Sequence, residues 1–499
     1  MLHPSSSVSS GWGLLTGAVL PTVRDLLALW AGRAVLKLSR RLGHGGSSLP
    51  GRVALRIQPA LLRRLAGKLR WGSVVITGTN GKTTTARLLS TILQDAGYRL
   101  VHNRSGANLK EGLTSAFLDD AAAARRRADI ALMEVDEATV PEAVRELRPL
   151  GIVVTNFFRD QLDRYGELDT TVSLVGRGID AVGGRGFVVL NADDPLVAAL
   201  GRGRGERVVF YGIEDDRCGK RTMTQTREQR HCLACGRELD YSVFYYGHLG
   251  RYACPGGDFR RPAPDVRAGA VRLGGVRGAS FTLSVRGEGE VRVAMPVPGL
   301  YNVYNALAAL AAALELGVPL SRAAASLERA GASFGRMEVI PVEERNVLLA
   351  LVKNPTGFNQ VLETLLGDAP AADGAGEAGG EGPRNFLIAI NDRYADGTDI
   401  SWLWDVDFEL LAERGARVGE IVVSGLRAHD MALRLKYAGV PEACVRVVPG
   451  LSEALDRALT ATARGETLLV TPTYTAMLEL RDIISRRGYA PPFWEAEKT

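Results

Sequence analysis

The residues whose chemistry is clearest form the segment Thr77 to Thr84, which reads Thr-Gly-Thr-Asn-Gly-Lys-Thr-Thr. Because Gly78 and Gly81 lack a Cβ, backbone N–H groups there can approach phosphate oxygens, and a helix starting here adds partial positive charge. Lys82 can reach the terminal phosphates of a nucleotide, and the Thr83 hydroxyl can ligate Mg²⁺. The sequence therefore predicts a nucleotide phosphate loop made of Gly78, Thr79, Asn80, Gly81, Lys82, Thr83 and Thr84.

A phosphate loop needs acidic residues nearby to hold the metal ion. Glu134 ends the apolar run Ile130 to Met133, at the edge where a parallel sheet would hold the nucleotide. We predict that Glu134 shares Mg²⁺ with Thr83. Asp136 and Glu137 are weaker candidates for the same role, and a helix-capping function of Glu134 is the alternative.

The elements that must position these residues follow a repeating pattern. From about residue 73, short β-rich apolar runs end in polar residues and are followed by amphipathic helical stretches. This alternation is typical of βαβ units around a parallel sheet. In such sheets ligands bind beyond the carboxyl ends of the strands, which is where the polar residues gather. We expect an α/β fold with a central ATPase domain.

Composition shifts divide the chain into segments. We predict an N-terminal helical arm at residues 1–55, a central nucleotide-binding domain at 56–338 and a C-terminal Rossmann-like α/β domain at 339–499. Residues 217–264 are rich in Cys, Arg, Tyr and Gly and are predicted to form an inserted small module. Residues 368–384 are almost entirely Ala, Gly, Pro, Asp and Glu, which is typical of a flexible surface loop.

Four of the five cysteines fall within the inserted module. Cys232 and Cys235 form a Cys-x-x-Cys pair, and Cys254 follows after 18 intervening residues, a spacing typical of a zinc ribbon. Structural zinc takes four N or S ligands, so a fourth is needed. We expect Cys218 to supply it, with His231 or His248 as alternatives. A degenerate ribbon held by its own packing is the competing interpretation.

The bulk properties limit the class of protein. A net charge of +5 over 499 residues is a mild excess that does not argue for nucleic-acid binding, and the ribbon lacks a dense basic face. No Lys or Arg precedes Arg24, so the start does not resemble a signal peptide and we expect a cytoplasmic protein. The stretch Leu26 to Leu42 predicts an amphipathic helix that either lies on a membrane or packs on its own domain.

Several blocks together are specific enough to indicate a family. Gly78 to Thr83 resembles the ATP loop of the Mur ligase superfamily, and 191–194, 301–306 and 335–336 resemble later blocks of that superfamily. Residues 156–161, 353–359 and 391–402 resemble the MurT subfamily, and the resemblance runs from about Leu49 to near Leu480. Relatives carry a further cysteine shortly after the third, where this chain has Pro-Gly-Gly at 255–257.

The resemblance implies an activity and a partner. MurT is the ligase-like subunit of lipid II isoglutaminyl synthase and pairs with the glutamine amidotransferase subunit GatD. It implies that ATP phosphorylates the α-carboxylate of D-glutamate in the lipid II stem peptide and that ammonia displaces the phosphate. Asn305 would then contact the adenine, and Arg336 would contact the phosphates. Asp399 would complete the partner's Cys–His pair, with Asp396 and Asp407 as competing acids.

The source of ammonia can also be argued from the residues. An amidotransferase needs an activated thiol, usually paired with a histidine, and the six His and five Cys contain no convincing pair. Ammonia must therefore be free or delivered by a partner. Two alternatives to the amidating ligase stay open: a Mur-type ligase that adds an amino acid to a peptidoglycan precursor, and a nucleotide-binding scaffold without chemistry.

Overall fold

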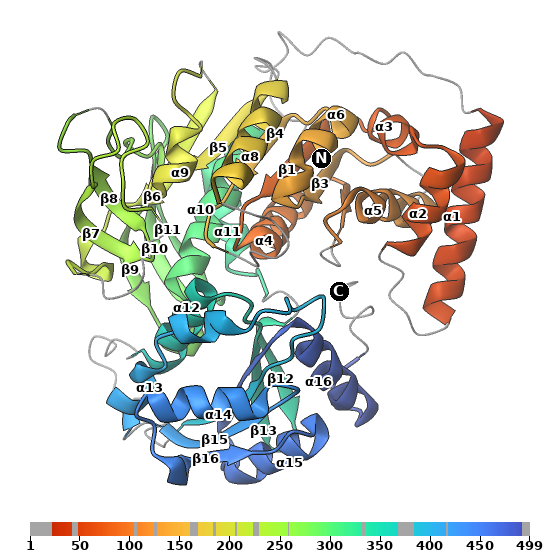
Figure 1. The fold of residues 1–499 in the computed structure, drawn as a ribbon. Coiled ribbons are helices and arrows are strands. Elements are labelled where there is room, and N and C mark those ends of the chain that lie inside the picture. Colours follow the sequence, from red (N-terminus) through yellow and green to blue (C-terminus); the bar gives the residue numbers. More distant parts are fainter. Residues whose placement is uncertain are drawn as a thin grey trace.

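The computed structural model describes most of the chain (Figure 1). The described residues are 22–41, 48–103, 107–123, 127–159, 168–182, 186–204, 207–222, 229–257, 259–331, 335–367, 384–415 and 418–491. All but one residue of the loop predicted at 368–384 lie outside these ranges. So do residues 1–21 of the predicted arm.

The first sheet has nine strands and forms the centre of the nucleotide-binding region. Its order is β11(Gly289–Met295), β10(Ala279–Val285), β9(Val266–Leu273), β6(Val208–Ile213), β5(Phe187–Asn191), β4(Gly151–Val154), β1(Gly72–Thr77), β3(Ile130–Glu134) and β2(Leu100–His102). The strands from β9 to β2 pair in parallel, and β10 is antiparallel to β9 and β11. Since parallel strands end at one sheet edge, β1 and β3 bring their following residues together.

Both faces of this sheet are covered by helices (Figure 1). In β1, Val74 and Ile76 pack on one side and Val75 on the other, as expected from the alternation of side chains along a strand. The first side is covered by α4(Lys82–Asp95), α10(Leu300–Glu315) and α11(Leu320–Leu327). The second side is covered by α3(Leu61–Ala66), α5(Lys110–Ala123), α6(Val140–Leu147), α8(Leu168–Val182) and α9(Pro195–Ala199).

The C-terminal sheet has six strands. Its order is β12(Arg336–Val342), β13(Arg345–Ala350), β17(Thr467–Pro472), β14(Arg384–Ala389), β15(Val418–Ser424) and β16(Val445–Val447), and only β12 is antiparallel to its neighbour. One face carries α12(Pro355–Leu366), α13(Glu409–Glu413) and α14(Ala428–Tyr437), and the other carries α15(Leu451–Ala461) and α16(Tyr474–Arg486). The domain boundary predicted at residue 338 falls inside β12, so Arg336 belongs to the C-terminal sheet.

Two smaller parts complete the molecule. The helices α1(Val23–Arg41) and α2(Leu49–Ile57) stack beside α5 at one edge of the first sheet, so the boundary predicted after residue 55 falls inside α2. The antiparallel pair β7(Asp240–Tyr246) and β8(Leu249–Ala253) lies between β6 and β9 in sequence and forms its own two-stranded sheet. Among the described residues, no helix combines the length and apolar character needed to cross a membrane.

Candidate active site

The predicted phosphate loop connects β1 to α4 at the carboxyl edge of the first sheet. Its two glycines adopt conformations that other residues rarely take, with φ 120° at Gly78 and φ 88° at Gly81. A Cβ on Gly78 would collide with the Thr155 side chain, and a Cβ on Gly81 would collide with the side-chain amide of Asn305. The loop is therefore a cradle whose shape depends on bare backbone at these two positions.

The segment that follows β4 holds the loop in place. Asn156 accepts a hydrogen bond from the Asn80 backbone N–H at 2.9 Å, and its carbonyl accepts one from the Thr79 N–H at 2.8 Å. The Thr155 hydroxyl donates to the Asn80 carbonyl at 2.7 Å. Thr79 Oγ1 in turn exchanges hydrogen bonds with the backbone of Phe158, at 3.1 Å and 3.0 Å. Residues 155–158 thus position the loop.

The residues Asn191 to Asp194 support this segment from β5. The Asn191 amide donates to the Thr155 carbonyl at 3.0 Å, and Asp194 accepts from the Phe157 N–H at 2.8 Å while capping α9. Asp193 is fully buried and accepts from the Tyr304 hydroxyl at 2.7 Å and from Arg261. Burial raises the pKa of Asp193, and the charge of Arg261 opposes that shift. Residues 191–194 therefore hold in place the segment 155–158, which positions the phosphate loop.

The predicted metal-binding pair is brought together. The Thr83 hydroxyl donates to Glu134 Oε2 at 2.7 Å, across the gap between the start of α4 and the end of β3. Hydroxyl and carboxylate oxygens are the donors that Mg²⁺ prefers. A magnesium ion would therefore fit between Thr83 and Glu134, as it does in phosphate loops that place the ion beside the terminal phosphates.

Lys82 is held by a carboxylate that the sequence ranked lower. Its Nζ lies 3.2 Å from Glu137 Oε1 and 3.3 Å from Oε2, and it also donates to the carbonyls of Gly78 and Thr79. Both charged side chains are 9% exposed. Glu137 starts a 3₁₀ turn capped by Asp136, whose carboxylate accepts from the Ala138 N–H. Of the three acids, Glu134 contacts Thr83, Glu137 contacts Lys82 and Asp136 caps its own turn.

The C-terminal domain reaches the phosphate loop directly. The side-chain amides of Asn80 and Asn354 exchange two hydrogen bonds, at 3.3 Å and 3.0 Å, and Lys353 Nζ donates to the Thr79 carbonyl at 3.2 Å. Asn354 also caps α12 by accepting from the Gly357 N–H. We call these three hydrogen bonds between residues 79–80 and 353–354 the interdomain latch. It places α12 next to the nucleotide-binding domain (Figure 1).

Of the two residues expected to contact ATP from outside the loop, Asn305 lies next to the loop and Arg336 interacts electrostatically with Glu134. Asn305, on α10, is buried against Gly81 and accepts a hydrogen bond from Thr85 Oγ1 at 3.4 Å. Burial lowers the pKa of Arg336, while the negative charge of Glu134 opposes that shift. Arg336 therefore interacts electrostatically with Glu134 across the junction of the two domains.

The three candidate acids of the C-terminal domain differ sharply in environment. Asp399 is exposed and accepts from the Ser401 backbone N–H at 2.8 Å and hydroxyl at 2.9 Å, which holds the pKa of Asp399 below its usual range. Asp396 is buried and binds the Thr475 backbone and hydroxyl. Asp407 is half-buried. Of these three acids, only Asp399 is exposed on the surface.

The cysteine module gathers three of its four cysteines. The ligand atoms of Cys232, Cys235 and Cys254 lie within 4.8 Å of one another, with Cys235 exposed and the other two buried. Three thiols in one group suit zinc, which takes thiolate ligands, but they leave one of its four positions open.

The expected fourth ligand, Cys218, is not brought to this group. It lies in the 3₁₀ turn after β6, donates to the Asp215 carbonyl at 3.0 Å and packs against the core of the first sheet. Burial raises the pKa of the Cys218 thiol to about 12. Neither alternative joins the group: His231 is exposed outside it, and His248 is buried 3.3 Å from Asp194.

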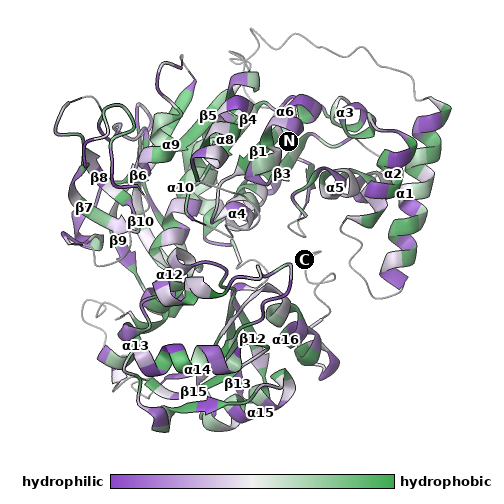
Figure 2. Cartoon of the chain, viewed as in Figure 1, coloured by the Kyte–Doolittle hydropathy of each residue, from purple (hydrophilic) through white to green (hydrophobic). Residues whose placement is uncertain are grey.

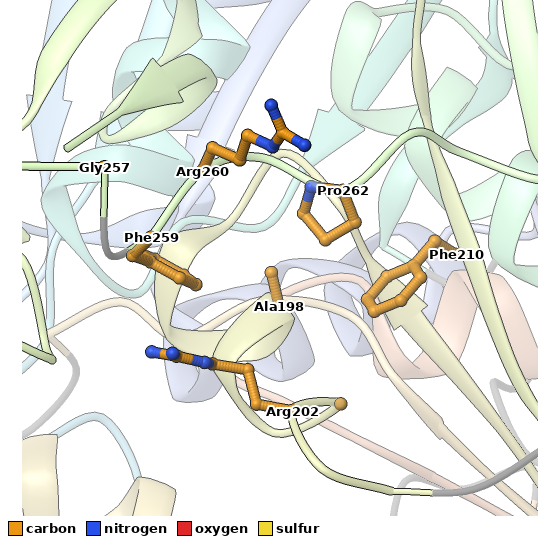
Figure 3. Close-up of a pocket in the computed structure, with 8 residues that line it drawn as sticks. Ala198, Arg202, Phe210, Gly257, Phe259, Arg260 and Pro262 are labelled. Atoms are coloured by element: carbon orange, nitrogen blue, oxygen red, sulfur yellow. The ribbon is translucent and has the colours of Figure 1, made fainter.

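A small hollow lies between the inserted module and the segments α9 and β6 (Figure 3). The rings of Phe210 and Phe259 line it, and the Arg202 guanidinium lies 5.6 Å from the centre of the Phe259 ring. Phe259 packs in the same small core as Cys232 and Cys254, and the lining residues include none of the phosphate loop, so the hollow lies at the junction of the inserted module with α9 and β6.

Comparisons with known proteins identify the families that the two domains match. Residues 76–251 match the Mur ligase middle domain, and residues 351–477 match the MurT ligase C-terminal domain. The chain is 33% identical over 465 residues to "Lipid II isoglutaminyl synthase (glutamine-hydrolyzing) subunit MurT" of Staphylococcus aureus (strain COL), covering 93% of this chain and 98% of the relative. The protein of the same name from Streptococcus pneumoniae (strain ATCC BAA-255 / R6) is also 33% identical, over 466 residues, with the same coverage.

Solved structures show the same fold. A crystal structure of MurF from Acinetobacter baumannii superposes with a TM-score of 0.63 at 19% identity, covering 87% of this chain and 80% of that one. At this identity the likeness concerns the fold alone.

Proposed function

Because the chain belongs to the MurT family of Mur ligases, we propose that it is the ATP-dependent ligase subunit of a lipid II isoglutaminyl synthase. In this reaction the α-carboxylate of the D-glutamate in the lipid II stem peptide becomes an amide. The observation that carries the proposal has two parts. Lys82, Thr83 and Glu134 lie together at the phosphate loop, and Lys353 and Asn354 of the MurT-type C-terminal domain contact this loop.

The chemistry explains why these groups are needed. A carboxylate is a poor electrophile, so its oxygen first attacks the γ-phosphorus of ATP, which forms an acyl phosphate and releases ADP. The nitrogen of ammonia then attacks the acyl carbon, the bond to the phosphate oxygen breaks, and phosphate leaves with the electron pair while ammonia loses a proton. Catalysis of phosphoryl transfer is mainly positioning and charge stabilisation.

Residues of this chain supply both the positioning and the charge stabilisation. Backbone N–H groups from Gly81 to Thr84, at the start of α4, would cradle the phosphates, and Asn305, which packs against Gly81, would contact the nucleotide. Lys82 and Arg336 place positive charge on the transferring group from the two domains. A magnesium ion held by Thr83 and Glu134 would neutralise further charge on the phosphates.

We further propose that ammonia comes from a GatD-type glutamine amidotransferase docked near Asp399. The exposed carboxylate of Asp399 can orient the imidazole of a partner's Cys–His pair. Exposed aromatic side chains lie in the same region of sequence and on α14: Tyr394 is 79% exposed, Trp404 52% and Tyr437 71%. Aromatic residues of this kind are enriched in protein interfaces.

The remaining assignments follow from the same proposal. The protein works in the cytoplasm, since ATP is its co-substrate, and a lipid-linked acceptor brings it to the inner face of the membrane. We also propose that Cys232, Cys235 and Cys254 hold a structural zinc ion, because their ligand atoms lie within 4.8 Å of one another and zinc takes thiolate ligands.

One assay tests the activity. The chain is supplied with ATP, Mg²⁺ and lipid II, and the nitrogen source is ammonium, glutamine, glutamine with a GatD-type partner, or a set of amino acids. We expect the product mass of an amide from ammonium, and from glutamine only with the partner. Transfer of an amino acid would indicate an ordinary Mur ligase, and ATP binding without any product would refute the proposal.

A further inference from the structure

The positive charge of the chain is concentrated in one segment. Residues 22–71 contain eleven Lys and Arg but only one acid, Asp25. Residues 1–21 contain no Lys, Arg, Asp or Glu, so residues 72–499 hold the remaining 50 basic and 55 acidic residues of the 61 and 56 in the chain. The overall charge of +5 is therefore the sum of +10 in the N-terminal helices and −5 elsewhere. Such asymmetry is typical of chains that bind an anionic surface.

The single acid of this segment is not available to offset the charge. Asp25 is 4% exposed and lies 2.8 Å from Arg64, and it also accepts from Gln58 and the Thr22 backbone. The exposed cations Arg24, Lys37 and Arg41 of α1 therefore face solvent with no acid of residues 22–71 beside them on the surface.

The outward face of α1 is also apolar. Val23 is 74% exposed, Leu27 53%, Trp30 73% and Leu38 57%, and Ala34 is exposed between them. These residues follow one another in steps of three or four, so they form one stripe along the helix. We call them the outer stripe. Leu26, 55% exposed, lies beside it.

The outer stripe lies opposite the face that holds α1 on the domain. Ala28, Gly32 and Leu36 are buried, and a Cβ on Gly32 would collide with Leu118 of α5. α1 therefore has two apolar faces, one covered by α2 and α5 and one turned away from the protein at its edge (Figures 1 and 2). Folding of the described domain explains the first face and not the second.

We propose that α1 is a membrane-surface helix whose outer stripe enters the headgroup region of an anionic bilayer. Helices that lie in the membrane interface combine Trp and Leu on the inserted face with Lys and Arg beside it. Here Arg24 borders the outer stripe on one side and Arg33 on the other, with Lys37 and Arg41 near its end. A nucleic acid would satisfy the charge but would leave Val23, Leu27 and Trp30 in water. The inference rests on charge and exposure alone and does not depend on the proposed activity.

Vesicle binding of the full chain tests the proposal. Sedimentation is measured with vesicles of pure phosphatidylcholine and of equimolar phosphatidylcholine and phosphatidylglycerol. We expect binding to the anionic vesicles that weakens as salt is raised, and at least roughly ten-fold weaker binding to the neutral ones.

Two sets of variants separate the apolar and the charged contributions. Leu27→Ser with Trp30→Ser removes the stripe, and Leu433→Ser with Tyr437→Ser, also exposed, is its matched control on α14. Arg24→Glu, Lys37→Glu and Arg41→Glu reverse the charge, with Arg267→Glu, Arg277→Glu and Arg292→Glu, all exposed, as the control. Each α1 set should weaken binding at least about ten-fold, and each control set less than about two-fold.

Insertion depth gives a second readout. Vesicles with brominated acyl chains should quench tryptophan fluorescence of the natural chain, and Trp30→Phe should remove most of that quenching while keeping the binding. Three results would overturn the proposal. They are equal binding to both kinds of vesicle, equal losses of binding in the α1 and control sets, and tight oligonucleotide binding that loss of the outer stripe does not weaken. Failure of the amidation assay would leave the vesicle result untouched, so the two proposals fail separately.

Discussion

Replacing Lys82 by Met tests the phosphate site most directly. The substitution keeps the apolar stem of the side chain and removes the ammonium that lies 3.2 Å from Glu137. Loss of one preorganised electrostatic group in an active site lowers turnover by about 10²–10³-fold, or about 2.7–4 kcal/mol of transition-state stabilisation. We expect ammonium-driven amidation to fall by that amount.

The same substitution also affects stability, because Glu137 is left buried without its cation. Breaking a buried ion pair by removing one partner costs about 3–5 kcal/mol, and the value here should lie near the lower end because each side chain is 9% exposed. The double variant Lys82→Met/Glu137→Gln removes both charges. It should recover most of the lost stability and none of the lost activity.

The assay pairs urea unfolding with amidation from ammonium, for both variants and for Glu137→Gln alone. Retention of activity within about ten-fold of the natural chain by the folded Lys82→Met variant would refute the assignment of Lys82 to the phosphates. Recovery of activity in the double variant would show that the first loss came from misfolding, and would equally contradict the reasoning.

Three further predictions follow from other parts of the structure. Asp399→Asn should lower the glutamine-driven reaction with the partner roughly 10²-fold or more and change the ammonium-driven one less than about two-fold, with the exposed Asp405→Asn as control; equal losses with both nitrogen sources would contradict the role across the interface. Asn354→Ala should lower the free energy of unfolding in urea by about 1 kcal/mol, because α12 loses its cap, and should also lower ATP turnover. Asn80→Ala should lower ATP turnover and leave the α12 cap intact. Because folding raises the pKa of the Cys218 thiol from 9.0 to about 12, the native state binds the proton more tightly and its stability should fall as pH rises above about 9. In the zinc-free protein, iodoacetamide at pH 8 should label the exposed Cys235 far faster than Cys218, and fast labelling of Cys218 would contradict its raised pKa.

The meeting of Thr83 and Glu134 could be predicted from the sequence for a geometrical reason. Each follows or ends a strand of a parallel sheet, β1 or β3, and such strand ends lie at one edge. Glu137 was harder to place, because it lies in a short turn whose direction depends on Asp136 capping it. Along the chain, Glu137 is the farthest of the three acids from the end of β3, yet it is the acid that contacts Lys82.

The interdomain latch lay beyond sequence reasoning. Asn80 and Asn354 are 274 residues apart, and their pairing depends on how two separately folded sheets sit against each other. The family resemblance marked residues 353–359 as a conspicuous block without saying what they touch. The prediction for Cys218 was wrong about its location because spacing alone cannot tell a ligand from a thiol that packs beneath a strand end.

The interdomain latch is one part of the junction between the two domains, beside the ion pair of Lys220 and Glu363 at 2.7 Å. Two of its three hydrogen bonds join uncharged amides, and the third joins an ammonium to a carbonyl dipole. At a net value of about 1 kcal/mol each, these three bonds contribute a factor of roughly 150 in favour of the joined arrangement. Added salt screens interactions between net charges and leaves neutral amide pairs almost unchanged. Added salt should therefore weaken the contact of α1 with a bilayer at concentrations that leave the amide pair of Asn80 and Asn354 unchanged.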